Sequence, residues 1–457
     1  MRTVIVSDLH LGNGQGYDIF AGAEALPAFL EQFTREPTRV VFNGDSVDFL
    51  MNEDPLELTV ERAVAQARAM VDSAPTSQVF RALGRVLAAG GEGVVRLGNH
   101  DVELALPEVR EVFRQALGQP PEVARRLVFE SGDAPRVLEV GGARVLLAHG
   151  EQNDAWNKVD YARLPGPGVT DASGFTYAVG SLLVKKLLNP LKREYGMRFA
   201  DLLVPDMRGA VMAALAVNPG AVKLVFQRSS LNLLWQLLRR GLAPVTFNPE
   251  DEPSEPELGL AERVKAAGLT EQEELALEEL LSDGPLSFGG DASEQESART
   301  KLGLHALRAY ARLHRALAGA QGERYFDLAP TEPELEEARR LARKYTADAV
   351  IFGHTHAARW QRAEDVLYAN SGTWIWLMRL PAADAPESVW TEFLQELRNN
   401  PGLDAGRQVL ARLESRFNAV LCGPHAAGGA EVSLVEWKPD AGIQVLASAR
   451  VAPTRVL

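Results

Sequence analysis

The chain has 457 residues, of which 46% are hydrophobic and 24% charged, a composition that is typical of globular proteins and excludes a disordered or fibrous chain. Its formal net charge is −13, from 48 basic and 61 acidic side chains. Residues 250–298 alone hold 15 acidic and 2 basic side chains, so the rest of the chain is balanced. The net charge therefore says little about partners.

The cysteine content and the hydropathy of the chain indicate the compartment in which the protein is located. The single cysteine, Cys422, cannot form an internal disulfide, and we expect it to be a small apolar core residue. No apolar run near the N-terminus is long enough for a signal peptide. The charge-free stretch at residues 209–222 has 14 residues, fewer than the roughly 20 that a spanning helix needs. We therefore expect a cytoplasmic protein.

The first 150 residues alternate strand and helix patterns. We predict strands at residues 3–7, 39–42 and 94–97, and helices at 23–33 and 56–89. This order indicates a mostly parallel sheet covered by helices. The pair Gly141-Gly142 between strand-like runs at 136–140 and 143–148 predicts a hairpin, and with it antiparallel strands.

The middle of the chain is predicted to be mainly helical. Residues 177–247 carry 10 basic and 3 acidic side chains among many leucines. The acidic segment at 250–298 follows as a linker, with helices predicted at 271–281 and 298–321. Beyond it we predict strands at 347–352, 366–369, 432–437 and 443–446, and helices at 389–397 and 408–417. Residues 1–150 and 346–457 would thus form one discontinuous domain around a helical insertion at 151–345.

Polar clusters follow the predicted strands. Their chemistry-bearing members are Asp8, His10, Asp45, Asn99, His100, Asp101, His149, His354 and His356. Because the carboxyl ends of strands form the binding crevice of open α/β sheets, we expect these side chains to converge. The other three histidines, His305, His314 and His425, lie in a helical pattern or a loop and are expected to be structural or exposed.

The donor set of these clusters is typical of a metal site. Two carboxylates, one amide and four imidazoles suffice for two divalent ions that share Asp45. With no thiolate present, Mn²⁺ fits best, and Fe or Zn²⁺ also fits. Any one residue could instead be a cap or a satisfied polar loop residue. The full ordered set would then need a separate explanation for each cluster.

The order of the motifs carries a family resemblance. The sequence reads D-x-H, G-D-x-x-D, G-N-H-D, H-G and G-H-T-H at Asp8, Gly44, Gly98, His149 and Gly353. In this order the motifs resemble the calcineurin-like metallophosphoesterase superfamily. The resemblance implies a four-layer α-β-β-α sandwich, here with an inserted mainly α-helical cap, and a dinuclear centre at one edge.

The resemblance also implies a role for each residue. The first ion would be held by Asp8, His10, Asp45 and His356, and the second by Asp45, Asn99, His149 and His354. The implied reaction is attack on a phosphoester by a hydroxide that bridges the two metals. His100 resembles the residue near the leaving group and is expected to act as general acid. We expect Asp101 to orient His100, and Asp48 resembles a residue that supports the ligands without binding metal.

Departures from the motifs narrow the resemblance. The protein Ser/Thr phosphatases follow the second motif with Arg-Gly, whereas this chain has Phe49-Leu50. The residues 7–12 and the Asp48-Phe49 pair resemble the bacterial branch that includes UDP-2,3-diacylglucosamine pyrophosphatase. That enzyme is far shorter and typically has Arg at the place of His100, so the resemblance extends to the branch and not to its substrate.

We therefore expect a hydrolase acting on a phosphodiester or pyrophosphate of a small or lipid-linked substrate. The alternatives are a metal-dependent nuclease or nucleotide phosphodiesterase and, more remotely, a metal-bound scaffold without activity. The basic helices at 177–247 could pack as a plain helical subdomain, contact an anionic membrane at the inner face, mediate a homodimer or bind nucleic acid. Nucleic acid fits less well because the chain as a whole is not basic.

Overall fold

The computed structural model describes residues 1–165, 174–204, 213–214, 216–218, 268–281, 291–318, 326–363, 365–403 and 413–453. Much of the basic segment 177–247 and of the acidic segment 250–298 lies outside the described residues. The expectations of membrane contact, nucleic-acid contact and an acidic linker therefore rest largely on the sequence. None of the described helices combines the length and apolarity that a membrane-spanning helix needs.

The larger sheet has seven strands in the order β15-β14-β13-β1-β2-β3-β4. The four strands β1 to β4 are parallel, and β13 joins β1 antiparallel, followed by β14 and β15. Their bounds are β1 Arg2–Val6, β2 Thr38–Asn43, β3 Glu92–Arg96, β4 Leu127–Glu130, β13 Asn418–Pro424, β14 Ala430–Lys438 and β15 Gly442–Val451. The first and last parts of the chain thus share one sheet.

A second sheet of five strands, in the order β5-β6-β8-β10-β9, packs on the first. The hairpin β5–β6 forms as expected around Gly141 and Gly142. The bounds are β5 Arg136–Val140, β6 Ala143–Leu147, β8 Ala349–Phe352, β9 Ala358–Arg362 and β10 Leu367–Ser371. One buried cluster joins Ile5 and Val41 of the larger sheet to Val145 and Ile351 of the smaller one, so the apolar faces of the two sheets form a sandwich.

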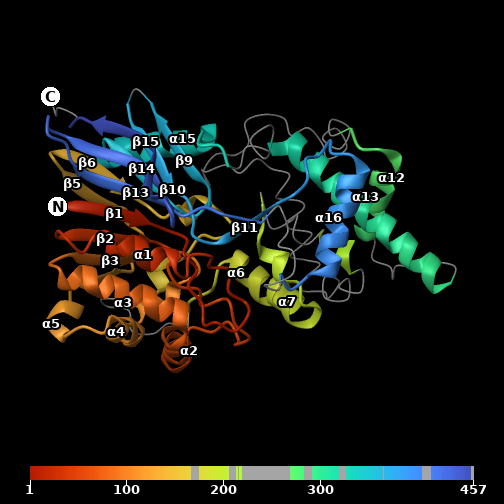
Figure 1. The fold of residues 1–457 in the computed structure, drawn as a ribbon, viewed down its shortest axis with the longest axis horizontal. Helices are drawn as coiled ribbons and strands as arrows, with labels where there is room; N and C mark the ends of the chain where they lie inside the picture. The colour runs from red at the N-terminus through yellow and green to blue at the C-terminus, as the bar shows by residue number, and fades with distance from the viewer. Residues whose placement is uncertain are drawn as a thin grey trace.

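Helices cover both outer faces of the sandwich (Figure 1). Because strand residues alternate between faces, Val4 and Phe42 face away from the second sheet and pack with Phe29 and Phe80 of the first helical layer. That layer contains α1 Ala25–Glu31, α2 Val60–Asp72, α3 Ala74–Ala88, α4 Pro107–Ala116 and α5 Pro121–Ala124. The other layer is α15, Glu332–Tyr345, whose Leu335 packs on the second sheet. The order is helix, sheet, sheet, helix, as expected.

The remaining helices gather at the end of the molecule opposite both termini (Figure 1). They share a buried cluster that joins Leu187, Leu307 and Trp390. A small sheet in the order β12-β11-β7 lies with them. These elements are α6 Val179–Leu183, a π-helical turn Val184–Leu188, α7 Asn189–Tyr195, α12 Glu271–Leu281, α13 Ala292–Ala318, α16 Glu387–Asn399, β7 Leu203–Val204, β11 Trp376–Arg379 and β12 Leu413–Ser415. The predicted insertion thus contributes α15 to the sandwich, whereas α16 packs with the helical part.

Helix α7 docks onto the loops that follow the first two strands. The side-chain amide of Asn189 donates to the carbonyl oxygens of Leu50 and Asn52 at 2.7 and 2.9 Å. The ammonium of Lys192, which is buried, donates to the carbonyl oxygen of Tyr17 at 2.9 Å. These loops begin just after the Asp8 and Asp45 motifs, so the helical part lies beside the polar clusters.

One predicted helix is wrong, and the described end of another is not helical. The pattern at 56–89 forms two helices, because Ser73 between them is extended and Pro75, in the first turn of α3, has no N–H for a continuing helix. The pattern at 408–417 ends in strand β12, which pairs with β11, and residues 404–412 lie outside the described part. The sequence reading also missed β13, a mostly buried strand that lies between β14 and β1 in the interior of the larger sheet.

Candidate metal centre

The motif residues adopt positive φ angles, a backbone conformation that residues other than glycine rarely adopt. The φ angles of Asp8, His10, Asp45, His354 and His356 are 53°, 49°, 50°, 68° and 57°. All five follow the carboxyl ends of β1, β2 and β8. Positive φ at non-glycine residues is strained and clusters at functional sites. The fold therefore holds these side chains in place at a cost to local stability.

One group of side chains forms around Asp8. Its Oδ1 lies 3.4 Å from Nε2 of His356, and Nε2 of His10 lies 3.1 Å from the same nitrogen. The ligand atoms of these three residues lie within 4.8 Å of one another. One buried carboxylate and two imidazoles thus face a common point, which is a donor set suited to a divalent cation.

A second group forms around Asp45, His149 and His354, again with ligand atoms within 4.8 Å of one another. Oδ2 of Asp45 lies 3.3 Å from Nε2 of His149 and 4.0 Å from Nε2 of His10, so this carboxylate reaches toward both groups. Among the described residues, Oδ1 of Asn99 is buried without a hydrogen-bond partner, and Nε2 of His149 has only its 3.3 Å contact with the Asp45 carboxylate. Buried polar atoms are normally paired, so these two atoms fit the coordination of a cation.

Two of the imidazoles are fixed from outside the cluster. Nδ1 of His10 lies 2.8 Å from Oδ2 of Asp48, and Nδ1 of His149 lies 2.8 Å from the carbonyl oxygen of Asn43. Each contact engages the outer ring nitrogen and leaves Nε2 facing the other polar side chains. Metal-binding histidines commonly donate their second N–H in this way.

His100 lies at the rim of the cluster, with its side chain 15% exposed. Its Nδ1 lies 3.0 Å from Oδ2 of Asp48, the same oxygen that His10 contacts. The expectation that Asp101 orients His100 stays a prediction, because the hydrogen bonds of Asp101 lead elsewhere. The two oxygens of Asp101 accept hydrogen bonds from the backbone N–H groups of Gly98 and Ser46 at 2.7 and 2.8 Å, so Asp101 joins two motif turns instead.

Close packing around the cluster requires glycine at two positions. A Cβ at Gly44, whose φ is 90°, would lie 2.3 Å from Cγ of His149. A Cβ at Gly98 would lie 2.2 Å from Oδ1 of Asp45. The G-D and G-N-H-D motifs therefore need their glycines because these turns touch ligand-bearing side chains directly.

The cluster holds opposite charges that are buried together. Burial alone would raise the pKa of Asp45, but the positive charges of His149 and His100 outweigh it and hold this pKa well below its usual range. Burial lowers the pKa of His149, but the charge of Asp45 outweighs this and raises it to about 10. Asp45 therefore requires a positive neighbour, which either a protonated imidazole or a cation supplies.

Sequence reasoning missed two residues at this site. Asp154 Oδ2 lies 3.2 Å from Nε2 of His354, and Asn157 Oδ1 accepts a 3.3 Å hydrogen bond from Nδ2 of Asn99. Both follow the H-G motif at His149 in a loop rich in polar residues. Nothing in that local pattern ranks one polar side chain above its neighbours.

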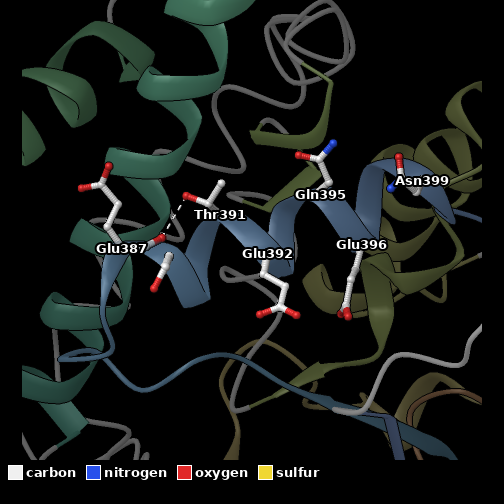
Figure 2. A pocket seen from close by; sticks show the side chains of 7 residues that line it. Glu387, Thr391, Glu392, Gln395, Glu396 and Asn399 are labelled. Carbon is white, nitrogen blue, oxygen red and sulfur yellow. Dashed lines mark hydrogen bonds between the residues drawn. The ribbon is translucent and has the colours of Figure 1, made fainter.

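A hollow of about 580 Å³ beside α16 is a second candidate site (Figure 2). It is lined by Glu387, Ser388, Thr391, Glu392, Gln395, Glu396 and Asn399. Figure 2 shows Glu392 and Glu396 pointing to the same side of the helix. Its carboxylates would repel an anionic phosphoester, and none of the predicted site residues lies there. The motif cluster is therefore the stronger candidate.

Comparison with known proteins bears on the first part of the chain. Residues 1–191 match the family model of the calcineurin-like phosphoesterases, which bind divalent metals and hydrolyse phosphoric ester bonds. The match supports the metallophosphoesterase superfamily and confirms the expected class of enzyme, a hydrolase of phosphoric esters. Asp8, His10, Asp45, Asn99 and His149 lie inside the matched span; His354 and His356 lie beyond it. No curated protein matches the chain.

Proposed function

We propose that this protein is a dinuclear metal-dependent phosphoesterase that hydrolyses a phosphodiester or pyrophosphate of a small or lipid-linked substrate. The observation that carries the proposal is the convergence of two three-residue groups, with the Asp45 carboxylate between His10 and His149. Residues that only cap loops would not leave a buried oxygen, such as Oδ1 of Asn99, without a hydrogen-bond partner.

The chain offers a set of donors for each of two cations. Asp8, His10, Asp45 and His356 would hold the first, and Asp45, Asn99, His149 and His354 the second. Two bound divalent cations would polarise a phosphoryl group and lower the pKa of water. We propose Mn²⁺ as the cation. The backbone N–H of His100 donates to Oδ1 of Asp45 at 2.9 Å and so fixes that carboxylate from the protein side.

His100 is the proposed proton donor to the leaving oxygen. Asp48 holds its Nδ1, which leaves Nε2 as the nitrogen that can give a proton. The partial exposure of His100 at the rim fits a group that must reach a bound substrate, unlike the fully buried His10. Asp48 supports both imidazoles through one oxygen and binds neither substrate nor cation in this proposal.

The helical part is proposed to act as a cap that selects the substrate. Helix α7 and the π-helical turn dock beside the motif loops, where Lys185 donates to the carbonyl oxygen of Asn52 at 2.9 Å. Lys185 and Lys192 thus make internal contacts, whereas Lys186 is exposed. Contact with a lipid substrate or with the inner face of an anionic membrane would depend on Lys186 and on basic residues outside the described part.

A metal-supplemented substrate screen tests this function. Metal-free protein would be loaded with Mn²⁺, Fe²⁺ or Zn²⁺ and assayed against bis-p-nitrophenyl phosphate, phosphomonoesters, nucleotides, UDP-sugars and single-stranded DNA. We expect metal-dependent hydrolysis of diesters or pyrophosphates, and a sharp loss of turnover in His100→Ala. If none of the phosphoesters is hydrolysed with any of the metals, the proposal that this protein is a phosphoesterase is rejected.

The same screen separates the substrate classes. Cleavage of UDP-sugars together with flotation on anionic liposomes would support a lipid-linked substrate. Cleavage of single-stranded DNA without flotation would favour a nuclease and overturn our substrate class while leaving the metal chemistry in place.

A further inference from the structure

The turn at residues 154–157 links two proposed ligands of the second cation. Oδ2 of Asp154 lies 3.2 Å from Nε2 of His354, and Oδ1 of Asn157 accepts a 3.3 Å hydrogen bond from Nδ2 of Asn99. Asp154 and Asn157 are also bonded to each other, because Nδ2 of Asn157 donates to Oδ2 of Asp154 at 2.7 Å. A continuous line of hydrogen bonds therefore runs from His354 to Asn99.

Asp154 sets the direction of every hydrogen bond in this line. An ionised carboxylate only accepts, so the Asn157 amide presents its NH₂ group to Asp154 and its oxygen to Asn99. The Asn99 amide must then present its NH₂ group to Asn157. Its Oδ1 is left buried without a hydrogen-bond partner among the described residues, which suits a cation ligand.

The same carboxylate fixes the tautomer of His354. The ring donates Nε2–H to Oδ2 of Asp154, which leaves the lone pair on Nδ1. A neutral imidazole with one N–H held by a carboxylate is the form in which histidine binds metal. Asp154 therefore prepares both His354 and, through Asn157, the Asn99 oxygen.

Gly180 of the helical insertion packs directly against this turn. Its backbone N–H donates to the carbonyl oxygen of Trp156 at 2.8 Å. A Cβ added at Gly180 would lie 2.0 Å from Oδ1 of Asn157 and would displace it. Helix α6 can therefore approach this turn so closely only because residue 180 is a glycine.

We propose that Asp154 and Asn157 are positioning residues for the second cation and that helix α6 sets the affinity for this cation through Gly180. This inference rests on the proposed dinuclear function. The first group should be unaffected, because His10 in that group takes its outer contact from Asp48 and not from the turn. The insertion would then control one cation position of the two.

Binding of Mn²⁺ to the metal-free full chain, followed by electron paramagnetic resonance, tests the inference without an activity assay. Wild type should bind two ions and show the spin-coupled signal of a close pair. Gly180→Ala should lower the affinity for the second ion by about 10- to 100-fold, which is the range usual for loss of an outer-sphere contact. The spin-coupled signal should then be lost at stoichiometric Mn²⁺. Gly423→Ala is the matched control, because a Cβ there has no atom within 4 Å, and it should bind as wild type does.

A double variant shows whether the effect passes through Asn157. Asn157→Ala should weaken the second ion by itself, and adding Gly180→Ala should cause no further loss because the clashing oxygen is gone. Additive losses, or equal weakening of both ions, would overturn the inference. Asn157→Ala only removes atoms, so it carries the test if Gly180→Ala does not fold.

The outcomes separate this inference from the function on which it rests. If wild type binds fewer than two Mn²⁺ ions, the dinuclear function fails and the inference with it. If wild type binds two ions and both Gly180→Ala and Asn157→Ala bind two ions equally tightly, only the inference is rejected.

Discussion

The phenolic hydroxyl of Tyr177 donates a 2.7 Å hydrogen bond to the buried carboxylate of Glu103. Glu103 lies just after the G-N-H-D motif, and Tyr177 lies just before α6, so the bond ties the insertion to a motif loop. Burial raises the pKa of Glu103 from 4.5 to about 7, although the Tyr177 hydroxyl opposes the shift. The folded protein therefore favours the neutral acid at this position.

Glu103→Gln should remove a pH dependence of stability. Between pH 4.5 and 7 the folded state keeps a proton that the unfolded state has lost, so stability from this group is present below pH 4.5 and lost as pH rises to 7. The slope is about 1.4 kcal/mol per pH unit in this window. Urea unfolding of both proteins across the window measures it. Parallel pH profiles would mean that Glu103 titrates normally.

Asp48→Asn and Asp101→Asn should differ in what they lose. Asp48 holds the two imidazoles of His10 and His100, so its variant should keep the fold and lose about 10- to 100-fold in kcat. Asp101 accepts backbone hydrogen bonds, so its variant should lose about 1–3 kcal/mol of stability. The exposed Asp133→Asn is the control for both. An Asp101 variant with normal stability and a low kcat would restore its expected role beside His100.

Cys422 should be inert to thiol reagents in the native protein. It is fully buried in strand β13 between the two sheets, and burial raises the pKa of its thiol to about 12. The thiolate that reacts is therefore scarce and inaccessible. One equivalent of thiol should react with Ellman's reagent only after denaturation. Fast labelling of folded protein would contradict this placement.

The sequence predicted the parts of the fold that depend on local pattern. Apolar runs located β1, β2 and β3, and the Gly141-Gly142 pair located the β5–β6 hairpin. It failed where partners distant in sequence decide. Residues 418–424 form the interior strand β13 only because β1 and β14 lie on either side, and no short-range signal reports such pairing.

The candidate site divides in the same way. Asp8, Asp45 and His149 could be predicted because they follow strands in a recognisable order. Asp154 could not, because its value comes from its contact with His354, 200 residues away. The partner of His100 could not either: adjacency favoured Asp101, but the turn at Gly98 directs that carboxylate to the backbone, and Asp48 reaches the ring from another strand end.

Removal of divalent metal should destabilise the protein, and Asp45→Asn should reduce this effect. Asp8 and Asp45 are buried carboxylates, and binding of cations to the folded state alone stabilises it by mass action, by about 2.7 kcal/mol for one site at a hundredfold excess over Kd. Chelation should therefore lower Tm, and Mn²⁺ should restore it. Because Asp45 lies between both groups, Asp45→Asn should shrink the Mn²⁺ shift more than Asp133→Asn, which should retain it in full. Identical Tm values with chelator and with Mn²⁺ in wild type would argue against a metal centre at this cluster.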